Sequence, residues 1–153
     1  MTVSILRAGP ADLDDLARLF DAYRQFYGQA STPVHAREWL RERLRFGESV
    51  VLVARHDGGV AGFTQLYPMY SSVRMARTWI LNDLYVDPSS RRKGVGQALL
   101  EGAARFARDD GAAGISLETG RDNEAARALY RAAGWQEDAT QWYSLPLEAT
   151  SLQ

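Results

Sequence analysis

The sequence predicts an α+β or mixed α/β fold in which helices flank a central sheet. The first indication is the order of its segments, β-α-α-β-β-β-α-β-α-β, which places helices between some strands and turns between others. The second is size, because 153 residues, 46% of them hydrophobic, suffice for one buried core. The third is that no repeat, low-complexity tract or linker interrupts the sequence. We therefore expect a single domain over residues 1–147 and a short tail at 148–153.

The first half of the chain predicts a strand, two helices and a hairpin. "VSILRAG" is typical of a strand, and Asp12 is a candidate N-cap for a helix whose apolar residues recur at helical spacing until Gly28. Thr32-Pro33 begins a second helix, with proline at its first position. The strands "SVVLVAR" and "VAGFTQLYPMY" flank "HDGG", which favours a β-hairpin.

The second half predicts alternating strands and helices. "TWILNDLYV" is a third long strand, and the helix after Gly96 runs to about Asp110. "GISLETG" is typical of a further strand, and "NEAARALYRAAG" predicts a compact helix that Gly134 ends. "WQEDATQWYSLPL" then predicts a final strand or hairpin.

Composition and charge exclude several classes of function. Lys+Arg is 18 and Asp+Glu is 19, so the net charge of -1 gives no general attraction to nucleic acid or to a membrane surface. The absence of cysteine excludes disulfides, thiolate catalysis and sulfur-ligated zinc. His35 and His56 are isolated, so no metal site is expected. Neither a signal peptide nor a long apolar run is visible, which predicts a cytoplasmic protein.

A basic, glycine-containing loop precedes the third helix. Arg91, Arg92 and Lys93 are followed by Gly94-Val95-Gly96, at the point where the helix begins. Free backbone N–H groups and partial positive charge at a helix N-terminus attract anions, and glycine lets a ligand approach closely. This combination predicts a phosphate or pyrophosphate site. The alternative is an ordinary helix start with solvated charges.

Two common phosphate motifs fit this loop poorly. A Walker loop ends in Gly-Lys-Ser/Thr, whereas Gly94 is followed by Val95. A Rossmann fingerprint needs a third glycine where this chain has Leu99, and its loop follows the strand more directly. Glu118 ends a later strand near where a ribose-binding acid is expected, so the Rossmann alternative stays open at this point.

Two motifs carry a family resemblance. "LNDLYVDPSSRRKGVGQALL" resembles the cofactor-binding core of the GCN5-related N-acetyltransferases (GNAT superfamily), whose signature is Arg/Gln-x-x-Gly-x-Gly/Ala. "DNEAARALYRAAGWQED" resembles the second motif of the same superfamily. The residues that match the two motifs are Arg91, Gly94 and Gly96, then Asn123, Ala126, Leu129, Tyr130, Gly134 and Trp135. The strand "WILNDLYV" and the preceding "YSS" turn resemble the HPA2-like branch.

The resemblance implies a GNAT fold, with a mixed, largely antiparallel sheet splayed between its fourth and fifth strands. It also implies acetyl-CoA as cofactor and CoA as product. The pantetheine arm is expected along Leu84, Tyr85 and Val86. The pyrophosphate is expected on the loop and the first turn of the helix, namely Arg91, Arg92, Lys93, Gly94, Val95, Gly96, Gln97 and Ala98. Asn123, Ala126 and Tyr130 complete the implied cofactor site.

Catalysis of acetyl transfer to an amine makes two demands on the protein. The leaving thiolate benefits from a proton donor, and Tyr130, two turns from Asn123 and about 10 Å along the same helix face, is the candidate general acid. The protonated amine must lose a proton, for which Asp83 is the candidate base or cation-attracting group, with Asn82 beside it. Adjacent strand residues face opposite ways, so only one of the pair is expected to point into the pocket. The alternatives are a core tyrosine and an arginine-paired aspartate.

The acceptor is expected to be a small primary amine such as a polyamine or an amino-acid derivative, attacked directly because no cysteine is present to form an acyl-enzyme. Aromatic residues are candidates for the pocket wall, by cation–π contact or simply as core. They are Tyr23, Tyr27, Trp39, Tyr67, Tyr70 and Trp79. A protein lysine or N-terminus is the second acceptor class, and a non-catalytic acetyl-CoA sensor is the alternative function. The resemblance also implies a homodimer, with "WYSLPL" as its edge.

Overall fold

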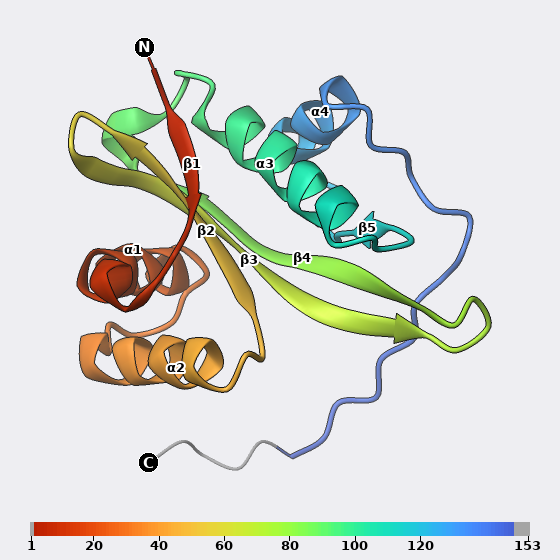
Figure 1. Ribbon diagram of the computed structural model, residues 1–153. Helices are drawn as coiled ribbons and strands as arrows, with labels where there is room; N and C mark the ends of the chain where they lie inside the picture. Colours follow the sequence, from red (N-terminus) through yellow and green to blue (C-terminus); the bar gives the residue numbers. More distant parts are fainter. Residues whose placement is uncertain (1, 149–153) are drawn as a thin grey trace.

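The computed structural model describes residues 2–148, which form a five-stranded sheet with helices on both faces (Figure 1). The helices α1 and α2 cover one face, and α3 and α4 cover the other (Figure 1). The strands are β1 (Ser4–Arg7), β2 (Val50–His56), β3 (Gly59–Ser71), β4 (Ala76–Val86) and β5 (Ile115–Ser116). The helices are α1 (Leu13–Phe26), α2 (Pro33–Arg45), α3 (Val95–Asp109) and α4 (Glu124–Ala132), with single 3₁₀ turns at Pro10–Asp12 and Pro88–Ser90. Within residues 2–148, no helix combines the length and the apolar character needed to cross a bilayer.

The sheet confirms the predicted mixed and largely antiparallel class. Its strands lie in the order β1-β2-β3-β4-β5, and all pairs except the last are antiparallel. The parallel pair β4–β5 extends over only two positions, Trp79–Ile115 and Ile80–Ser116. Beyond Ile80 the two strands separate, so the predicted splay between the fourth and fifth strands is confirmed. The mostly antiparallel order does not fit the Rossmann alternative, which needs a mostly parallel sheet.

Strand β4 contains a bulge where it passes the site. Gln65 of β3 pairs with Asp83, but the next residue, Leu66, pairs with Leu81, so Asn82 is an extra residue without a partner of its own. Leu81 packs into the core under α3, whereas Tyr85 packs into the core under α1. A bulge bends its strand and changes the aim of nearby side chains. Here it lies two residues beyond the last pair with β5.

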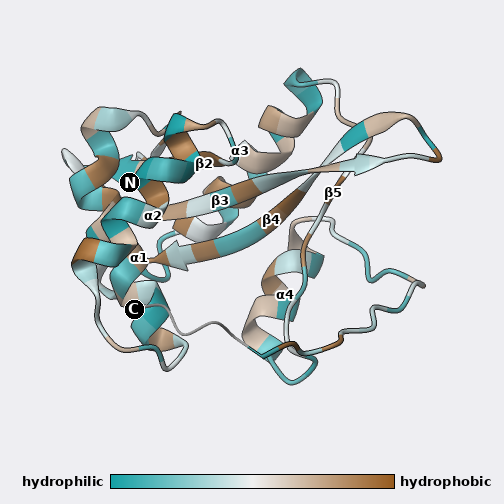
Figure 2. Cartoon of the chain, turned by 90° about the horizontal axis from the view of Figure 1, so that it is seen from below, coloured by the Kyte–Doolittle hydropathy of each residue, from teal (hydrophilic) through white to brown (hydrophobic). Residues whose placement is uncertain are grey.

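The hydrophobic cores lie on the two faces of the sheet. Phe63, Leu16 and Leu40 are fully buried on the α1–α2 side, and Leu99 and Leu100 are fully buried on the α3 side. Figure 2 shows brown, hydrophobic stretches along β4 and in the helices beside the sheet. Burial of such side chains, each contributing about 1.5–3 kcal/mol, holds the helices against the strands.

Asp12 does not cap α1 in the expected way. A 3₁₀ turn at Pro10–Asp12 precedes the helix, and Asp12 makes no side-chain cap bond to it. Its Oδ2 instead accepts the Gly9 N–H at 2.8 Å, and its Oδ1 binds the Arg55 guanidinium. The Gly9 amide and then Arg55 lower the pKa of the Asp12 carboxyl, against its partial burial. Asp12 therefore joins the start of α1 to β2.

The predicted final strand or hairpin at "WQEDATQWYSLPL" is wrong. Residues 136–148 contain no strand and run along the outside of the molecule (Figure 1). Their apolar side chains are exposed, with Trp142 at 74%, Tyr143 at 89%, Leu145 at 83% and Leu147 at 81%. A strand needs a neighbour for its backbone N–H and C=O groups, and β5, with two paired residues, offers almost no edge. Of the tail expected at 148–153, residues 149–153 lie outside the described part of the chain.

Asp21 joins α1 to the start of α2. It is buried, with 6% of its surface exposed, and it accepts hydrogen bonds from Ser31 Oγ at 2.7 Å and from the Thr32 N–H at 2.8 Å. Gln25 Nε2 donates to the same carboxylate at 3.2 Å. Asp21 thereby fixes the loop that leads from α1, whose last turn faces the cleft described below, into α2.

We predict that Asp21→Ala lowers the free energy of unfolding by about 2 kcal/mol or more, because three donors lose a charged acceptor that is itself buried. Urea denaturation of the purified protein measures this change. The control is Asp14→Ala, which removes the exposed ion pair between Asp14 and Arg37 and should cost less than about 1 kcal/mol. Equal losses in the two variants would contradict a special role for Asp21.

Candidate active site

A cleft of about 620 Å³ opens where β4 and β5 separate. Four parts of the chain line it: α1, β4, the segment after β5, and α4. The lining includes six of the sequence-predicted residues, namely Tyr23, Tyr27, Asn82, Leu84, Asn123 and Tyr130. The structure thus brings candidate cofactor, acceptor and catalytic residues to one place.

The basic loop and α3 form a second part of the site. Arg92 and Gly94 both have positive φ angles, 62° and 79°, and Gly94 is the N-cap of α3. The first intrahelical bond runs from the Ala98 N–H to the Gly94 carbonyl, at 3.0 Å. The N–H groups of residues 95–97 precede that bond and have no partner within the helix. They are the donors that the predicted anion site would use, and phosphate binding there stays a prediction.

The three cations of the loop are used differently. Arg91 Nε donates to the Val86 carbonyl at 3.1 Å, and its guanidinium carbon lies 5.6 Å from the centre of the Tyr85 ring. Lys93 Nζ donates to the Ser89 carbonyl at 3.3 Å, and Arg92 is exposed. Arg91 therefore ties the loop to the end of β4, while Arg92 adds positive charge at the surface.

The edge of β4 that β5 leaves open leads toward this loop. A Cβ built on Gly96 would lie 3.9 Å from a methyl group of Val86 and 3.4 Å from one of Leu129, so the start of α3 packs closely between β4 and α4. An extended amide chain suits an open sheet edge, and a pyrophosphate suits a helix N-terminus. The residues present therefore fit a pantetheine arm on Leu84–Val86 with its phosphates at residues 91–98. In the first turn, Ala98 is half-buried and Gln97 binds Glu101.

Asn123 and Tyr130 stand at the two ends of α4. Asn123 is the N-cap, and its Oδ1 accepts the Ala126 N–H at 3.2 Å, which leaves its Nδ2 as a donor toward the cleft. Ala126 is half-buried and does not line the cleft. Burial, and then the nearby Tyr27, raise the pKa of the half-buried Tyr130 phenol. Tyr130 therefore stays protonated at neutral pH, as a proton donor must.

Asp83 lies behind Asn82, and the two side chains touch. Asp83 is 8% exposed; its Oδ2 accepts Gln65 Nε2 at 2.8 Å and its Oδ1 accepts Asn82 Nδ2 at 3.1 Å. Among the ion pairs of residues 2–148, none joins Asp83 to an arginine, so the arginine-paired alternative does not describe it. Burial first and the Asp83 carboxylate second raise the pKa values of Tyr23 and Tyr67. A carboxylate held by two side-chain amides thus lies beside the cleft.

The predicted aromatic wall is only partly assembled. Tyr23 and Tyr27 line the cleft, whereas Tyr67 of β3 is not among its lining residues. Tyr70 lies near the tip of the β3–β4 hairpin, 68% exposed, and does not reach the cleft. Trp79 precedes the bulge and therefore faces α3, where it is 4% exposed and its Nε1 donates to Asp110 at 3.0 Å. The expectation that Tyr70 and Trp79 wall the acceptor pocket is corrected by these positions.

Trp39 also lies outside the cleft lining. It is 45% exposed on α2, and the guanidinium carbon of Arg43 lies 4.1 Å from the centre of its ring. The sequence reasoning missed Ser49 and Gln65, which are both buried and lead to Asp83. The sequence feature that could have predicted these contacts is the glutamine in the largely apolar run "VAGFTQLYP", because a buried amide needs hydrogen-bond partners.

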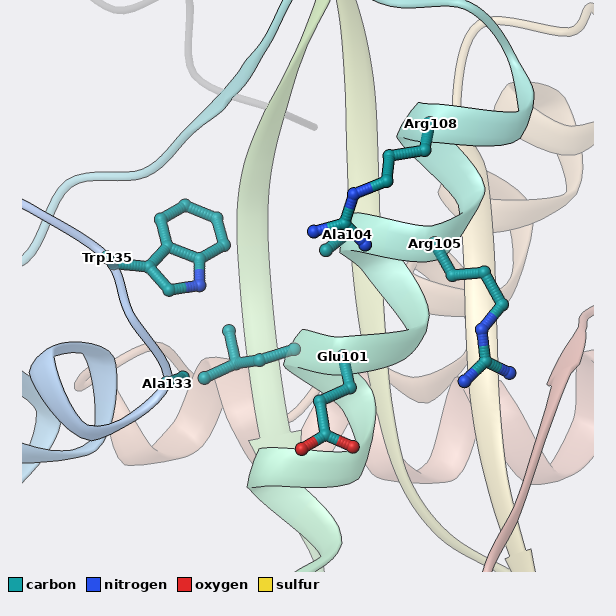
Figure 3. A pocket seen from close by; sticks show the side chains of 7 residues that line it. Glu101, Ala104, Arg105, Arg108, Ala133 and Trp135 are labelled. Atoms are coloured by element: carbon teal, nitrogen blue, oxygen red, sulfur yellow. The ribbon is translucent and has the colours of Figure 1, made fainter.

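A smaller hollow of about 260 Å³ lies between α3 and the end of α4 (Figure 3). Glu101, Arg105 and Arg108 on α3 form its charged rim, and Trp135 stands on the other side (Figure 3). It shares no lining residue with the cleft. Its arginines, Arg105 and Arg108, distinguish it from the cleft, whose described lining residues include no lysine or arginine.

Comparison with known proteins identifies the class. Residues 15–135 match the model of the "Acetyltransferase (GNAT) family", so the chain belongs to this family of acyltransferase enzymes. The resemblance read from the two motifs is thereby confirmed, and the HPA2-like branch stays a prediction.

Individual relatives agree with this class. The chain is 46% identical to the uncharacterized N-acetyltransferase YhfO of Bacillus subtilis (strain 168) over 136 residues, which cover 89% of this chain and 91% of that protein. The crystal structure of a probable acetyltransferase superposes with a TM-score of 0.92 at 42% identity, covering 95% of this chain and 99% of the other. An aminoglycoside N(6′)-acetyltransferase type 1 of Klebsiella aerogenes is 32% identical over 104 residues, 67% of this chain and 68% of that protein.

We predict that Gly94→Ala weakens CoA binding about tenfold or more, because alanine is strained at a φ of 79° and the loop must shift. Isothermal titration calorimetry with CoA measures the affinity. The matched control is Gly111→Ala, which has a φ of 77° and equally open surroundings but lies at the far end of α3. In both variants the free energy of unfolding should fall by about 1 kcal/mol. Equal loss of CoA affinity in both would show that the loop has no special role.

Proposed function

We propose that this chain is an acetyl-CoA-dependent N-acetyltransferase that acts on a primary amine of a small, cationic molecule, such as a polyamine or an amino-acid derivative. The observation that carries this proposal is the cleft itself, in which the open edge of β4, the Tyr130 phenol and the Asn82–Asp83 pair meet. The acetyltransferases of this family typically use acetyl-CoA, which supplies an activated thioester. The amine attacks it directly, since the sequence contains no cysteine.

The distribution of charge supports a cationic acceptor. Arg91, Arg92 and Lys93 gather at the loop, where phosphates would bind. None of the described residues that line the cleft is a lysine or arginine, whereas Glu118 and Asp122 are among them. The cleft is therefore suited to an uncharged pantetheine arm and a positively charged amine, and the loop to the anionic end of CoA.

The chain's own residues have distinct roles in this proposal. Asn123 Nδ2 donates to the pantetheine amides, and the half-buried Ala126 leaves the helix face uncrowded. Tyr130 holds the proton that the leaving sulfur needs, since its raised pKa keeps the phenol neutral. Asp83, with Asn82 at the cleft edge, attracts the ammonium group and accepts its proton directly or through water. Tyr23 of α1 and Tyr27, which caps that helix, contribute the aromatic wall.

The name of one relative supports a small acceptor, whereas a solved structure with 25% identity is titled a ribosomal-protein-alanine N-acetyltransferase. The Klebsiella relative is named for aminoglycosides, which are small molecules bearing several amines. A protein lysine or N-terminus, and a non-catalytic acetyl-CoA sensor, are the other outcomes of the test below. A cytoplasmic location stays a prediction of the sequence.

We predict acetyl-CoA-dependent thiol release with at least one of a panel of amines comprising spermidine, free lysine and kanamycin. In Tyr130→Phe we expect kcat to fall about 100-fold, because the proton donor is lost, with CoA affinity unchanged. Tyr143→Phe is the matched control, since Tyr143 is 89% exposed and remote from the cleft lining. CoA binding without turnover on any amine would favour the sensor, and turnover only on peptides would favour the protein acceptor.

We further propose a homodimer formed through the C-terminal segment. Trp142, Leu145 and Leu147 expose apolar surface that a second copy would cover. We predict that the protein sediments as a dimer and that Trp142→Ser with Leu145→Ser shifts it toward the monomer. Analytical ultracentrifugation measures both states, and Val73→Ser, an exposed apolar change on the β3–β4 turn, is the control. A monomeric wild type at all concentrations would contradict the dimer.

A further inference from the structure

A continuous chain of buried hydrogen bonds leads from the start of β2 to Asp83. Ser49 Oγ donates to Gln65 Oε1 at 2.9 Å, and Gln65 Nε2 donates to Asp83 Oδ2 at 2.8 Å. Gln65 is completely buried, and Ser49 is 4% exposed. From Asp83 the chain continues to Asn82 at the cleft. Every link is therefore shielded from bulk water until it reaches the cleft.

The direction of this chain is fixed by its chemistry. A carboxylate accepts hydrogen bonds only, so the Gln65 amide must turn its NH₂ group toward Asp83. Its carbonyl oxygen must then face Ser49, whose hydroxyl has a proton to donate. The reversed amide would place two acceptors together and leave a buried donor without a partner, which costs about 1–3 kcal/mol. The hydrogen bonds from Ser49 to Gln65 and from Gln65 to Asp83 therefore fix the orientation of the Asp83 Oδ2 atom.

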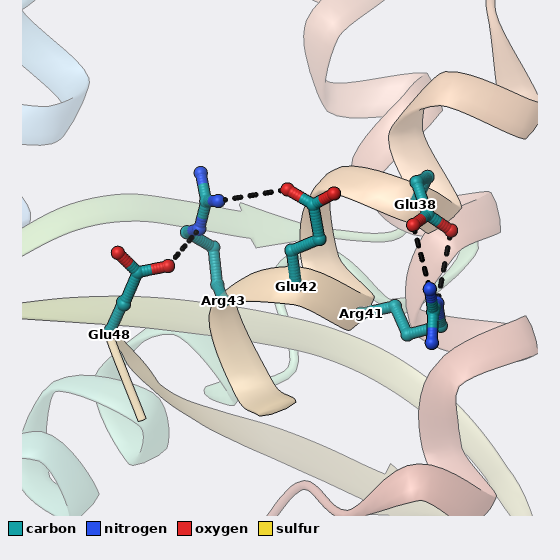
Figure 4. Close-up of polar contacts among 5 residues, drawn as sticks. All are labelled: Glu38, Arg41, Glu42, Arg43 and Glu48. Carbon is teal, nitrogen blue, oxygen red and sulfur yellow. Dashed lines mark hydrogen bonds and ion pairs between the residues drawn. The ribbon is translucent and has the colours of Figure 1, made fainter. Parts of the chain in front are cut away.

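Both ends of the chain are anchored in the fold. At the outer end, Arg43 Nε donates to Glu48 Oε1 at 3.1 Å and its Nη2 to Glu42 at 3.2 Å, so α2 contacts the residue before Ser49 (Figure 4). At the inner end, the bulge brings Gln65 opposite Asp83. Thr64 Oγ1 holds the Asp83 main-chain carbonyl at 2.7 Å. The backbone and the side chain of Asp83 are therefore held separately.

We propose that Gln65 is a positioning residue for acetyl transfer, with Ser49 as its anchor. The proposal rests on the proposed function, in which Asp83 attracts and deprotonates the amine. Gln65 occupies Oδ2 and leaves Oδ1 beside Asn82, on the side of the cleft. Through this contact, residues on β2 and β3 that touch no substrate fix which oxygen of Asp83 serves the acceptor.

The test is a double-mutant cycle on kcat. Gln65→Met keeps the length of the side chain and removes both polar contacts, so we expect kcat for the amine to fall about tenfold or more, with the KM for acetyl-CoA unchanged. In the Asp83→Asn background the same change should alter kcat less than about twofold, because a residue that acts through Asp83 has nothing left to orient. Ser49→Ala should lower kcat in the same direction by a smaller factor. Thermal unfolding checks that each variant is folded.

Two kinetic results would overturn this inference. One is a Gln65→Met variant with the kcat of the wild type. The other is an equal loss in both backgrounds, which would show a general effect on the fold. If the wild type turns over no amine, the proposed function fails, and a crystal structure of Gln65→Met still decides the positioning role. We expect the Asp83 carboxylate to rotate in that crystal, and an unmoved carboxylate would overturn the inference.

Discussion

The separation of β4 from β5 is the constraint on which the rest of the site depends. Two residue pairs hold these strands together, and immediately beyond them an extra residue, Asn82, interrupts the pairing of β4 with β3. If the parallel pairing with β5 continued, the backbone N–H and C=O groups at this edge of β4 would bond to β5. Because the pair ends at Ile80, that edge stays open, and α1 and α4 can line the space between the strands. The start of α3, the proposed anion site, follows β4 after residues 87–94.

The polar groups beside this opening are kept in place by buried contacts rather than by exposed ion pairs. Asp83 is oriented by amides and by a main-chain contact at the bulge. Asp21 plays a comparable structural part on the other side, where it fixes the passage from α1 to α2. Among residues 2–148, no buried side-chain nitrogen or oxygen lacks a partner. Buried polar networks of this kind specify one arrangement because every alternative leaves a donor or acceptor unpaired.

How much of this could be predicted from the sequence depended on how local each feature is. The loop from Arg91 to Gly96 and the cap at Asn123 lie within short motifs, so their positions followed from nearest neighbours in the chain. Trp79 was misplaced because a single extra residue in β4 decides which face a side chain takes, and strand alternation alone does not reveal a bulge. Ser49 and Gln65 were missed because they are 16 residues apart and meet only through strand pairing. The prediction of a C-terminal strand was wrong for the same reason. A strand-like sequence does not show whether the fold offers a neighbouring strand with which it can pair.

The carboxylates in the cleft have a consequence for the end of the reaction. In the proposed reaction, acetylation converts an ammonium group into a neutral amide, so the product carries one positive charge fewer for Glu118 and Asp122 to attract. A contact between unit charges about 4 Å apart is worth about 1 kcal/mol even in water, and losing it shortens the residence time of the ligand. In this proposal, the surface that attracts the acceptor holds the acetylated product less tightly, which would limit product inhibition without any moving part.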